Sequence, residues 1–169
     1  SSDSPANPAV SDPNPASECS AGHVESETEH LAEYHVEMLS AHGIKPEVAE
    51  ASGARTILEV DDLPDDLQWA AGADEDSDGQ VPGLLYCHTT LDGTKVFQYA
   101  PDEPVDLDDD GRIRKYIFPK GAGAPITIPP GHRERIGRAT DILIAEGTKQ
   151  TLAAASWAPP HVLVVGICG

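Results

Sequence analysis

The segment 141–169 constrains the fold more than any other part of this chain. Its first apolar run, residues 142–145, predicts a buried parallel strand that ends at Glu146. An alanine-rich stretch at 148–157, followed by two prolines, predicts a helix. A second apolar run at 162–165 completes a βαβ unit. Ligands of such units gather at the carboxyl ends of the strands, which is where Glu146 is expected.

The predicted strand-to-helix turn carries residues suited to phosphate chemistry. A carboxylate at Glu146 can bind a metal ion or act as a general acid or base. Gly147 permits a sharp turn and the close approach of a phosphate, and Lys149 in the first helical turn can neutralise a phosphate oxygen. An ordinary turn explains the same residues, because Glu complements a helix dipole, Gly permits the turn, and an exposed Lys is usually only solvated.

The net charge of −18 argues against binding to nucleic acid, but the charges are segregated. Eight of the eleven basic residues lie between Arg112 and Lys149, together with only three acidic residues. This pattern predicts a basic face beside Glu146, to which Lys115, Arg133 and Arg135 would contribute. Pairing of these residues with the acidic loops explains the segregation equally well.

The rest of the sequence predicts an α+β fold. Residues 1–25 lack large apolar side chains and are expected to be disordered. Region 26–139 is expected to be a helical part followed by a small antiparallel sheet, and region 140–169 the opening βαβ of an α/β unit. Expected helices start at Ser26, which fits a capping box, and at Pro46, and a third covers 64–71. Expected strands cover 56–60, 83–89, 95–99, 112–118 and 126–128, with Asp92-Gly93 as a hairpin turn.

The order of several short motifs resembles a family of replication proteins from phages, plasmids and integrated elements. In that family this region precedes and enters a Toprim-like domain, the module shared by bacterial-type primases, topoisomerases and related nucleases. The likeness covers roughly residues 28–169. The motifs are His30-Leu-Ala-Glu, Gly43-Ile-Lys-Pro-Glu-Val-Ala, Gln98-Tyr-Ala-Pro-Asp102, Lys115-Tyr-Ile-Phe-Pro119, Glu146-Gly-x-Lys149, and the closing Gly166 and Gly169. One departure is Ala100, where the family pattern leads us to expect an Arg before Pro101-Asp102.

The resemblance implies that Glu146 is a catalytic residue and a Mg²⁺ ligand. The second Toprim motif, an Asp-x-Asp on a later strand, has no counterpart before Gly169, so we expect a truncated Toprim-like domain that is inactive by itself. Candidate nucleic-acid- and phosphate-binding residues are Gly147, Lys149, Arg133, Arg135 and Lys115. Implied partners are DNA or RNA and a helicase.

Other sites are disfavoured by their spacing. Two aspartate-rich loops, at 74–79 and 106–111, begin like EF-hands, but Leu85 and Ile117 stand where a bidentate Glu is needed. The histidines near Cys19 lack the paired cysteines of a zinc ribbon. The three cysteines are far apart, and no signal peptide or apolar membrane span is visible. We therefore expect reduced thiols and a cytoplasmic protein without a membrane partner.

Three functional hypotheses remain from the sequence. The first is the N-terminal part of a mobile-element DNA replication protein whose Toprim-like domain performs metal-dependent phosphodiester chemistry; whether the full-length protein is an enzyme is left open. The second is a non-catalytic nucleic-acid or helicase-coupling module in which Glu146 is only a turn residue. The third is an acidic protein that imitates DNA and binds a DNA-processing enzyme.

Overall fold

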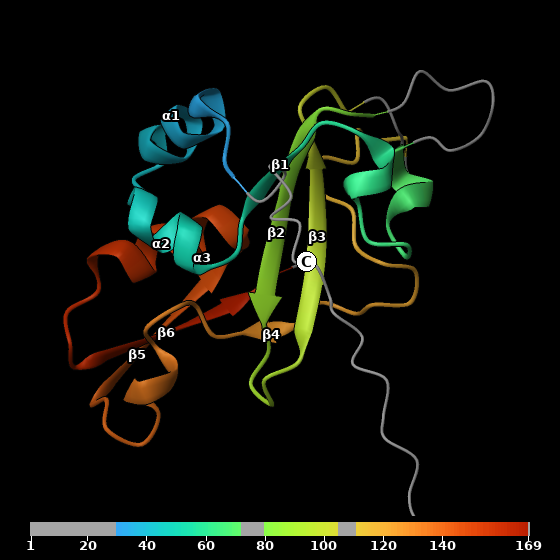
Figure 1. The fold of residues 1–169 in the computed structure, drawn as a ribbon. Helices are drawn as coiled ribbons and strands as arrows, with labels where there is room; N and C mark the ends of the chain where they lie inside the picture. Colours follow the sequence, from blue (N-terminus) through green and yellow to red (C-terminus); the bar gives the residue numbers. More distant parts are fainter. Residues whose placement is uncertain (1–29, 72–79, 105–110, 169) are drawn as a thin grey trace, which may run out of the picture.

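The computed structural model describes residues 30–71, 80–104 and 111–168, which form the mixed α+β fold that the sequence predicts (Figure 1). The expected disordered tail, the capping box at Ser26, the pair Cys19 and His23, and nearly all of both aspartate-rich loops lie outside these residues. The helices, 3-10 helices (η) and strands are α1 (Glu33–Ala41), α2 (Pro46–Ala51), β1 (Arg55–Ile57), η2 (Val60–Asp62), η3 (Gln68–Ala71), β2 (Gly83–Thr89), β3 (Lys95–Pro101), β4 (Ile126–Thr127), η4 (Arg133–Arg135), β5 (Asp141–Glu146), α3 (Thr148–Trp157) and β6 (Val162–Ile167).

The N-terminal part is helical, as predicted, and its boundaries follow from glycine and proline. Gly43 has a φ of 77°, a left-handed conformation that glycine adopts most easily and that ends α1. Pro46 is the first residue of α2, where its missing N–H matters least. α1 begins only at Glu33, later than the capping box suggested. No described helix combines the length and apolarity of a membrane span.

The first sheet is antiparallel, in the order β1-β2-β3. The predicted β2–β3 hairpin is confirmed, with Cys87 opposite Phe97 and the turn at Asp92 and Gly93. The Asp92 carboxylate accepts hydrogen bonds from the Thr90 hydroxyl and from the Thr94 N–H, the latter at 3.0 Å. These bonds lower the pKa of Asp92 to about 2.

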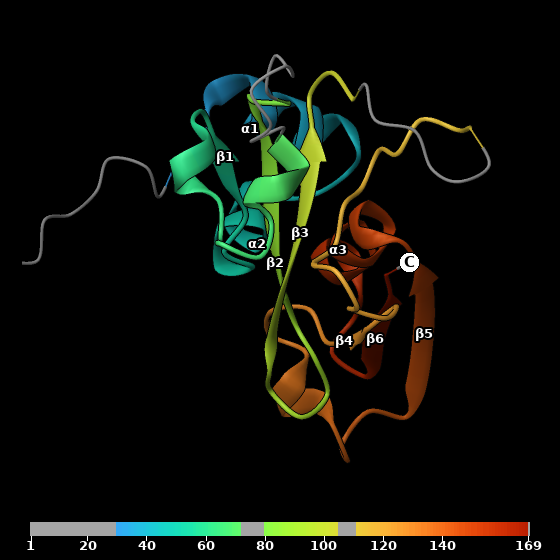
Figure 2. The same cartoon turned by 90° about the vertical axis from the view of Figure 1, so that its right-hand side faces the viewer.

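The βαβ unit is also confirmed. β5 and β6 pair in parallel, and α3 connects them in the second sheet, whose order is β4-β6-β5. The predicted burial of the first strand is wrong. Ile142 and Ile144 are each 66% exposed, because β5 lies at the outer edge of the sheet (Figure 2). An apolar run reports a preference for burial, but neighbouring elements decide whether burial occurs, and no described element covers these side chains.

The expected strand at 112–118 is replaced by an irregular segment that is held by isolated backbone bridges. Ile117 forms an antiparallel bridge with Tyr99, with two backbone hydrogen bonds of 2.8 Å. Ile117 is buried, whereas Ile113, which also forms an isolated bridge, is 55% exposed. The alternating pattern therefore reflects isolated bridges and not a continuously paired strand. This matters for the site, because Tyr116 lies next to Ile117.

Short turns replace two other expected elements. β1 ends at Ile57 and is followed by η2, where the sequence predicted a strand to Val60. The expected helix at 64–71 is a turn followed by η3. Leu63 and Leu67 are each buried as single anchors, so this segment has no continuous apolar face that would favour a longer element.

Both faces of the first sheet are covered. One core cluster lies between the sheet and the helices and consists of Leu39, Ile44, Ala49, Ala54, Leu84, Tyr86 and Leu152. The other lies under the irregular segments and consists of Ile57, Leu63, Leu67, Leu85, Tyr99 and Ile117. Because Leu84 and Leu85 point to opposite faces, β2 is buried on both sides.

Helix α3 and the second sheet are joined to the first sheet and the N-terminal helices by several contacts. The Trp157 indole N–H donates to the Gly43 carbonyl at 2.7 Å, and the Lys45 N–H donates to the Ser156 hydroxyl at 3.0 Å. At the other end, the Ile128 N–H donates to the Thr89 carbonyl at 2.8 Å. α3 therefore lies between the N-terminal helices and its own sheet, as Figure 1 shows.

Candidate functional site

The turn after β5 places Glu146 at the carboxyl end of a parallel strand. Gly147 follows with a φ of 84°, and its N–H donates to the Ile167 carbonyl at 2.9 Å. A Cβ at this position would lie 2.7 Å from Gln150 Oε1. The turn therefore requires glycine for its conformation, as the sequence predicted. The Gly147 carbonyl accepts from both the N–H and the hydroxyl of Thr151, which fixes the first turn of α3.

Glu146 lines a cavity of about 480 Å³. Three separate parts of the chain form its wall: β3, the irregular segment, and the turn that begins α3. The lining residues are Gln98, Tyr116, Glu146, Gly147, Thr148 and Gln150. Glu146 is exposed, and among the described residues its carboxylate forms no ion pair. The carboxylate is therefore accessible to a ligand.

Two of the predicted phosphate-binding lysines are chain neighbours of residues that line this cavity, although neither lysine lines it itself. Lys149 follows Thr148, and Lys115 precedes Tyr116. Partial burial lowers the pKa of Lys149, and repulsion from the nearby Lys115 lowers it further. Two cations close enough to repel each other make this part of the surface attractive to an anion. The structure thus brings Lys115 near Lys149, whose chain neighbour Thr148 lines the cavity together with Glu146 and Gly147.

The two predicted arginines lie elsewhere. Arg133 donates to the carbonyls of Thr90 at 3.3 Å and Leu91 at 3.1 Å, at the end of the hairpin. Arg135 donates to the carbonyls of Pro159 and Val162, each at 2.8 Å. Val162 begins β6, whereas Glu146 ends the parallel strand beside it.

Such six-residue strands separate their two ends by roughly 16 Å, since each residue advances about 3.3 Å. The arginines therefore fix the loop at 128–140, at the end of the sheet away from the cavity. Contact of Arg133 or Arg135 with nucleic acid stays a prediction.

The donor set of the cavity suits a metal ion only in part. It offers one carboxylate, Glu146, besides amide and hydroxyl oxygens. No group of three or more His, Cys, Asp or Glu side chains that could hold a metal ion occurs among the described residues. Mg²⁺ is often held by one or two carboxylates plus substrate phosphates. The Glu146 carboxylate could therefore supply one ligand of such a site, and the described residues supply no second carboxylate to it.

The position where the family pattern leads us to expect an Arg borders the core. Ala100 is partly buried and packs against the cluster between β3 and the helices, opposite Leu84. The next motif residue, Asp102, accepts a hydrogen bond from His35 at 2.8 Å, so this end of β3 has a structural role.

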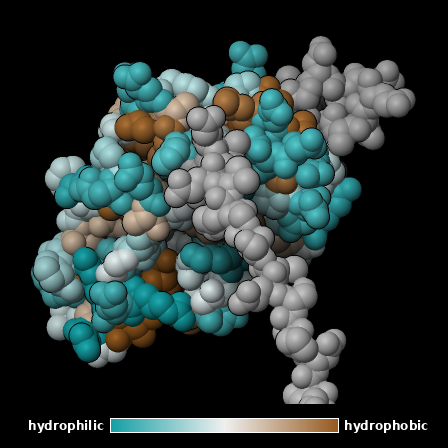
Figure 3. Space-filling view, viewed as in Figure 1, coloured by the Kyte–Doolittle hydropathy of each residue, from teal (hydrophilic) through white to brown (hydrophobic). Residues whose placement is uncertain are grey.

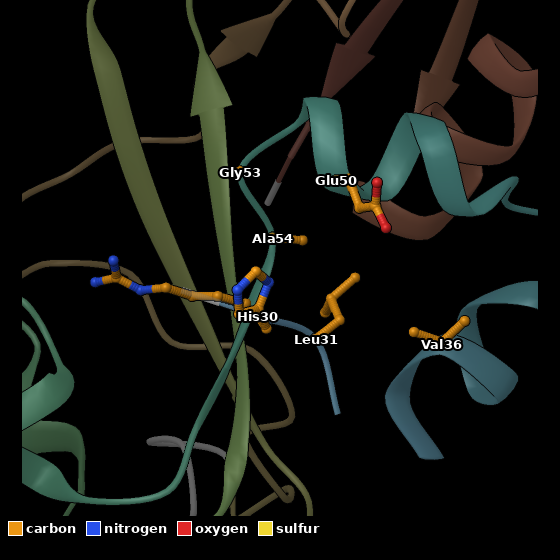
Figure 4. Close-up of a pocket in the computed structure, with 7 residues that line it drawn as sticks. His30, Leu31, Val36, Glu50, Gly53 and Ala54 are labelled. Atoms are coloured by element: carbon orange, nitrogen blue, oxygen red, sulfur yellow. The ribbon is translucent and has the colours of Figure 1, made fainter. Parts of the chain in front are cut away.

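A second cavity, of about 490 Å³, lies on the opposite side of the helices. Figure 4 shows Leu31 between Ala54 and Val36 of α1, with His30 on the side of Leu31 away from Val36. Its lining includes a single carboxylate, Glu50. The residues before His30 lie outside the described part of the chain, so nothing indicates what this cavity binds.

Sequence reasoning missed four of the cavity residues: Gln98, Tyr116, Thr148 and Gln150. No local motif includes them all, since they come from three segments. One signal was present: Gln98 and His88 are polar residues on strands that are otherwise apolar, and such side chains are buried only when they have partners.

The fold consists of an antiparallel sheet and a second sheet in which Glu146 ends a parallel strand. This fold can be compared with those of known proteins. The crystal structure of the Aquifex aeolicus primase (zinc binding and RNA polymerase domains) superposes with a TM-score of 0.55. The match is 16% identical in sequence and covers 82% of this chain and 37% of that one. The chain therefore has a primase-like fold and spans about a third of the length of this primase structure.

The sequence comparisons add no closer relative. No family model matches the chain, and no curated protein matches it. The predicted origin in a phage, plasmid or integrated element therefore rests on the order of motifs alone.

Proposed function

We propose that this chain is part of a cytoplasmic, primase-like DNA replication protein of a mobile element, and that the Glu146 cavity binds the phosphates of a nucleotide or nucleic acid. The observation that carries the proposal is the exposed Glu146 carboxylate, which lies at a strand end, lines the cavity and has Lys149 three residues further along the chain. The primase-like fold supports it, because the likeness covers most of the chain.

In this proposal Glu146 is a Mg²⁺ ligand, and further carboxylates of an Asp-x-Asp motif beyond Gly169 complete the site. The bound ion would neutralise charge on the reacting phosphate. Lys149 and Lys115 bind phosphate oxygens beside the cavity, and Gly147 lets a phosphate approach the start of α3. In nucleotidyl transfer, a hydroxyl oxygen bonds to the α-phosphorus of a nucleoside triphosphate, pyrophosphate leaves, and the hydroxyl proton passes to solvent.

Glu146→Gln in the full-length protein tests the catalytic assignment. We expect Mg²⁺-dependent incorporation of labelled nucleotides on single-stranded DNA to be lost, because an amide binds Mg²⁺ poorly. Glu47→Gln is the matched control, since Glu47 is an exposed residue of α2 far along the chain from the cavity. Equal activity of the Glu146 variant and the unaltered protein would remove Glu146 from the chemistry.

The net charge of −18 favours a second candidate, an acidic protein that imitates DNA. Such a protein would not bind single-stranded DNA itself and would compete with DNA for a processing enzyme. Salt-sensitive binding of single-stranded DNA by the chain would exclude this candidate. Binding without any metal-dependent activity of the full-length protein would instead support a non-catalytic module coupled to a helicase.

A further inference from the structure

A buried chain of polar side chains connects the first sheet to the Glu146 cavity. Thr148, at the start of α3, donates its hydroxyl to Gln98 Oε1 on β3. His88 Nε2 on β2 lies 3.3 Å from the same oxygen, and the Cys168 thiol lies 3.8 Å from His88 Nδ1. Gln98 is 2% exposed, Thr148 3%, His88 8% and Cys168 0%. Side chains so deeply buried have defined hydrogen-bond roles.

Each hydrogen bond in this buried chain can be assigned a donor and an acceptor. Burial lowers the pKa of His88, so its imidazole is neutral and carries one proton. Because Gln98 Oε1 can only accept, we assign that proton to Nε2, which also lies 3.4 Å from the Thr148 hydroxyl oxygen, and Nδ1 then accepts from the Cys168 thiol. The Gln98 amide oxygen therefore receives two donors, one from His88 and one from Thr148.

This arrangement fixes the orientation of the Gln98 amide group. The amide oxygen is held on the buried side by Thr148 and His88. The NH₂ group is therefore the part of the amide that can face the cavity that Gln98 lines. Among the described residues, no hydrogen-bond acceptor pairs with this NH₂ group, and it is not an enclosed, unsatisfied atom. An amide held in one orientation is a donor that needs no rearrangement to bind an acceptor.

We propose that the Gln98 carboxamide is a preoriented hydrogen-bond donor that binds a phosphate oxygen of a nucleoside triphosphate in the Glu146 cavity. The inference rests on the proposed function and adds a contact from the first sheet, at a residue to which the sequence analysis assigned no role. The other groups on this side of the cavity agree with an anionic occupant. Lys149 and Lys115 are cations, and the first N–H groups of the ten-residue helix α3 begin at Thr148.

Thr148 and His88 are positioning residues in this proposal. They do not bind the phosphate; they hold Gln98 so that its NH₂ group points to it. Thr148→Val keeps the shape of the side chain and removes one of the two donors to Gln98 Oε1. The amide is then held by His88 alone, and we expect a smaller effect than from loss of the amide itself.

The test is calorimetric titration of the full-length protein with ATP and with inorganic triphosphate, each with Mg²⁺, and with adenosine. Gln98→Met keeps the length of the side chain and removes the donor. We expect it to weaken binding of both triphosphates by roughly 10-fold to 100-fold, as for a hydrogen bond to a charged group. Thr148→Val should weaken both by a few-fold. Gln68→Met, on η3 outside the cavity lining, is the matched control and should bind normally.

The outcomes separate this inference from the function on which it rests. Normal triphosphate binding by a folded Gln98→Met variant overturns the role of Gln98, while loss of the Mg²⁺-dependent part in Glu146→Gln still supports the proposed function. No binding of either triphosphate by the unaltered chain overturns both. An unchanged melting temperature shows that a variant is folded. If Gln98→Met is unfolded, Thr148→Val decides, and equal binding by that variant overturns the positioning role.

Discussion

His35 Nε2 on α1 lies 2.8 Å from Asp102 Oδ1 at the end of β3. The imidazole is buried, and its Nδ1 lies 2.8 Å from the Thr56 hydroxyl on β1. Asp102 also accepts from the Tyr34 hydroxyl at 3.0 Å. One buried ring thus joins the first helix to two strands of the first sheet.

Asp102→Ala should destabilise the fold. The change removes the acceptor of His35 and of Tyr34 and leaves a buried imidazole N–H without a partner. We expect the free energy of unfolding to fall by about 1–3 kcal/mol. Asp102→Asn should cost less, because the amide oxygen can still accept. Urea denaturation measures the difference, with Glu103→Ala as the exposed neighbour for comparison. A loss no larger than that of the Glu103 variant would show that this contact contributes nothing to stability.

The sequence correctly predicted those parts of the fold that short patterns of neighbouring residues specify. The Asp92-Gly93 turn defines the hairpin, and the acid-glycine step after an apolar run defines the βαβ unit. The strand predicted around Ile117 was wrong because a strand needs a partner along its length, and this segment forms only isolated bridges, such as the one between Ile117 and Tyr99. The site follows the same rule: Glu146 belongs to a local pattern, whereas Gln98 enters the cavity through long-range packing.

Gly147→Ala should destabilise the turn before α3 because of the backbone conformation at this position. Gly147 has a φ of 84° and a ψ of 157°, a region that essentially only glycine adopts, whereas an added Cβ would meet only the movable end of the Gln150 side chain. Gly121→Ala, at a φ of 82° with no atom within 4 Å of the added Cβ, is the comparison and should cost about 1 kcal/mol. We expect Gly147→Ala to lower the free energy of unfolding by more than this, up to about 3 kcal/mol, and to weaken ATP binding. Thermal denaturation of the two variants side by side checks the order.

Stability should fall as the pH drops below about 6.5, the ordinary pKa of histidine. Burial lowers the pKa of His88 and of His132 in the folded state, so the unfolded chain takes up these protons first and protonation favours unfolding. His88→Gln should make this dependence shallower between pH 6.5 and 5. Asp92 does not interfere, because its pKa of about 2 confines its titration to lower pH.

Urea denaturation at several pH values measures the slope, and His42→Gln is the control, since His42 is exposed. A slope that is the same in the His88 variant and the unaltered chain would mean that the buried imidazole keeps its ordinary pKa.

Lys115→Gln and Lys149→Gln should each reduce the salt dependence of binding to single-stranded DNA. Each phosphate contact contributes about 0.7 to the slope of log K against log salt, so the double variant should lose roughly 1.4. Lys95→Gln should leave the slope unchanged, because Lys95 donates to Thr89 on the hairpin. Fluorescence anisotropy at several salt concentrations measures the slopes.

Arg135→Gln should differ from the lysine variants by lowering the melting temperature, because its guanidinium binds the carbonyls before and at the start of β6. A reduced salt slope with an unchanged melting temperature in this variant would support a nucleic-acid contact of Arg135 in place of the structural role.

Ile144→Lys should leave stability nearly unchanged and reduce self-association. Ile144 is 66% exposed on β5, the edge strand of the second sheet, and Figure 3 shows hydrophobic residues at the surface in the region of this sheet. Exposed edge strands with apolar side chains pair with other chains, and a lysine opposes such pairing. We expect a change of at most about 0.5 kcal/mol in unfolding free energy.

Val164→Lys, at a fully buried position of the neighbouring strand β6, should instead prevent folding. Sedimentation at increasing concentration checks the association. A large loss of stability in the Ile144 variant would mean that this face of β5 is covered in the folded chain.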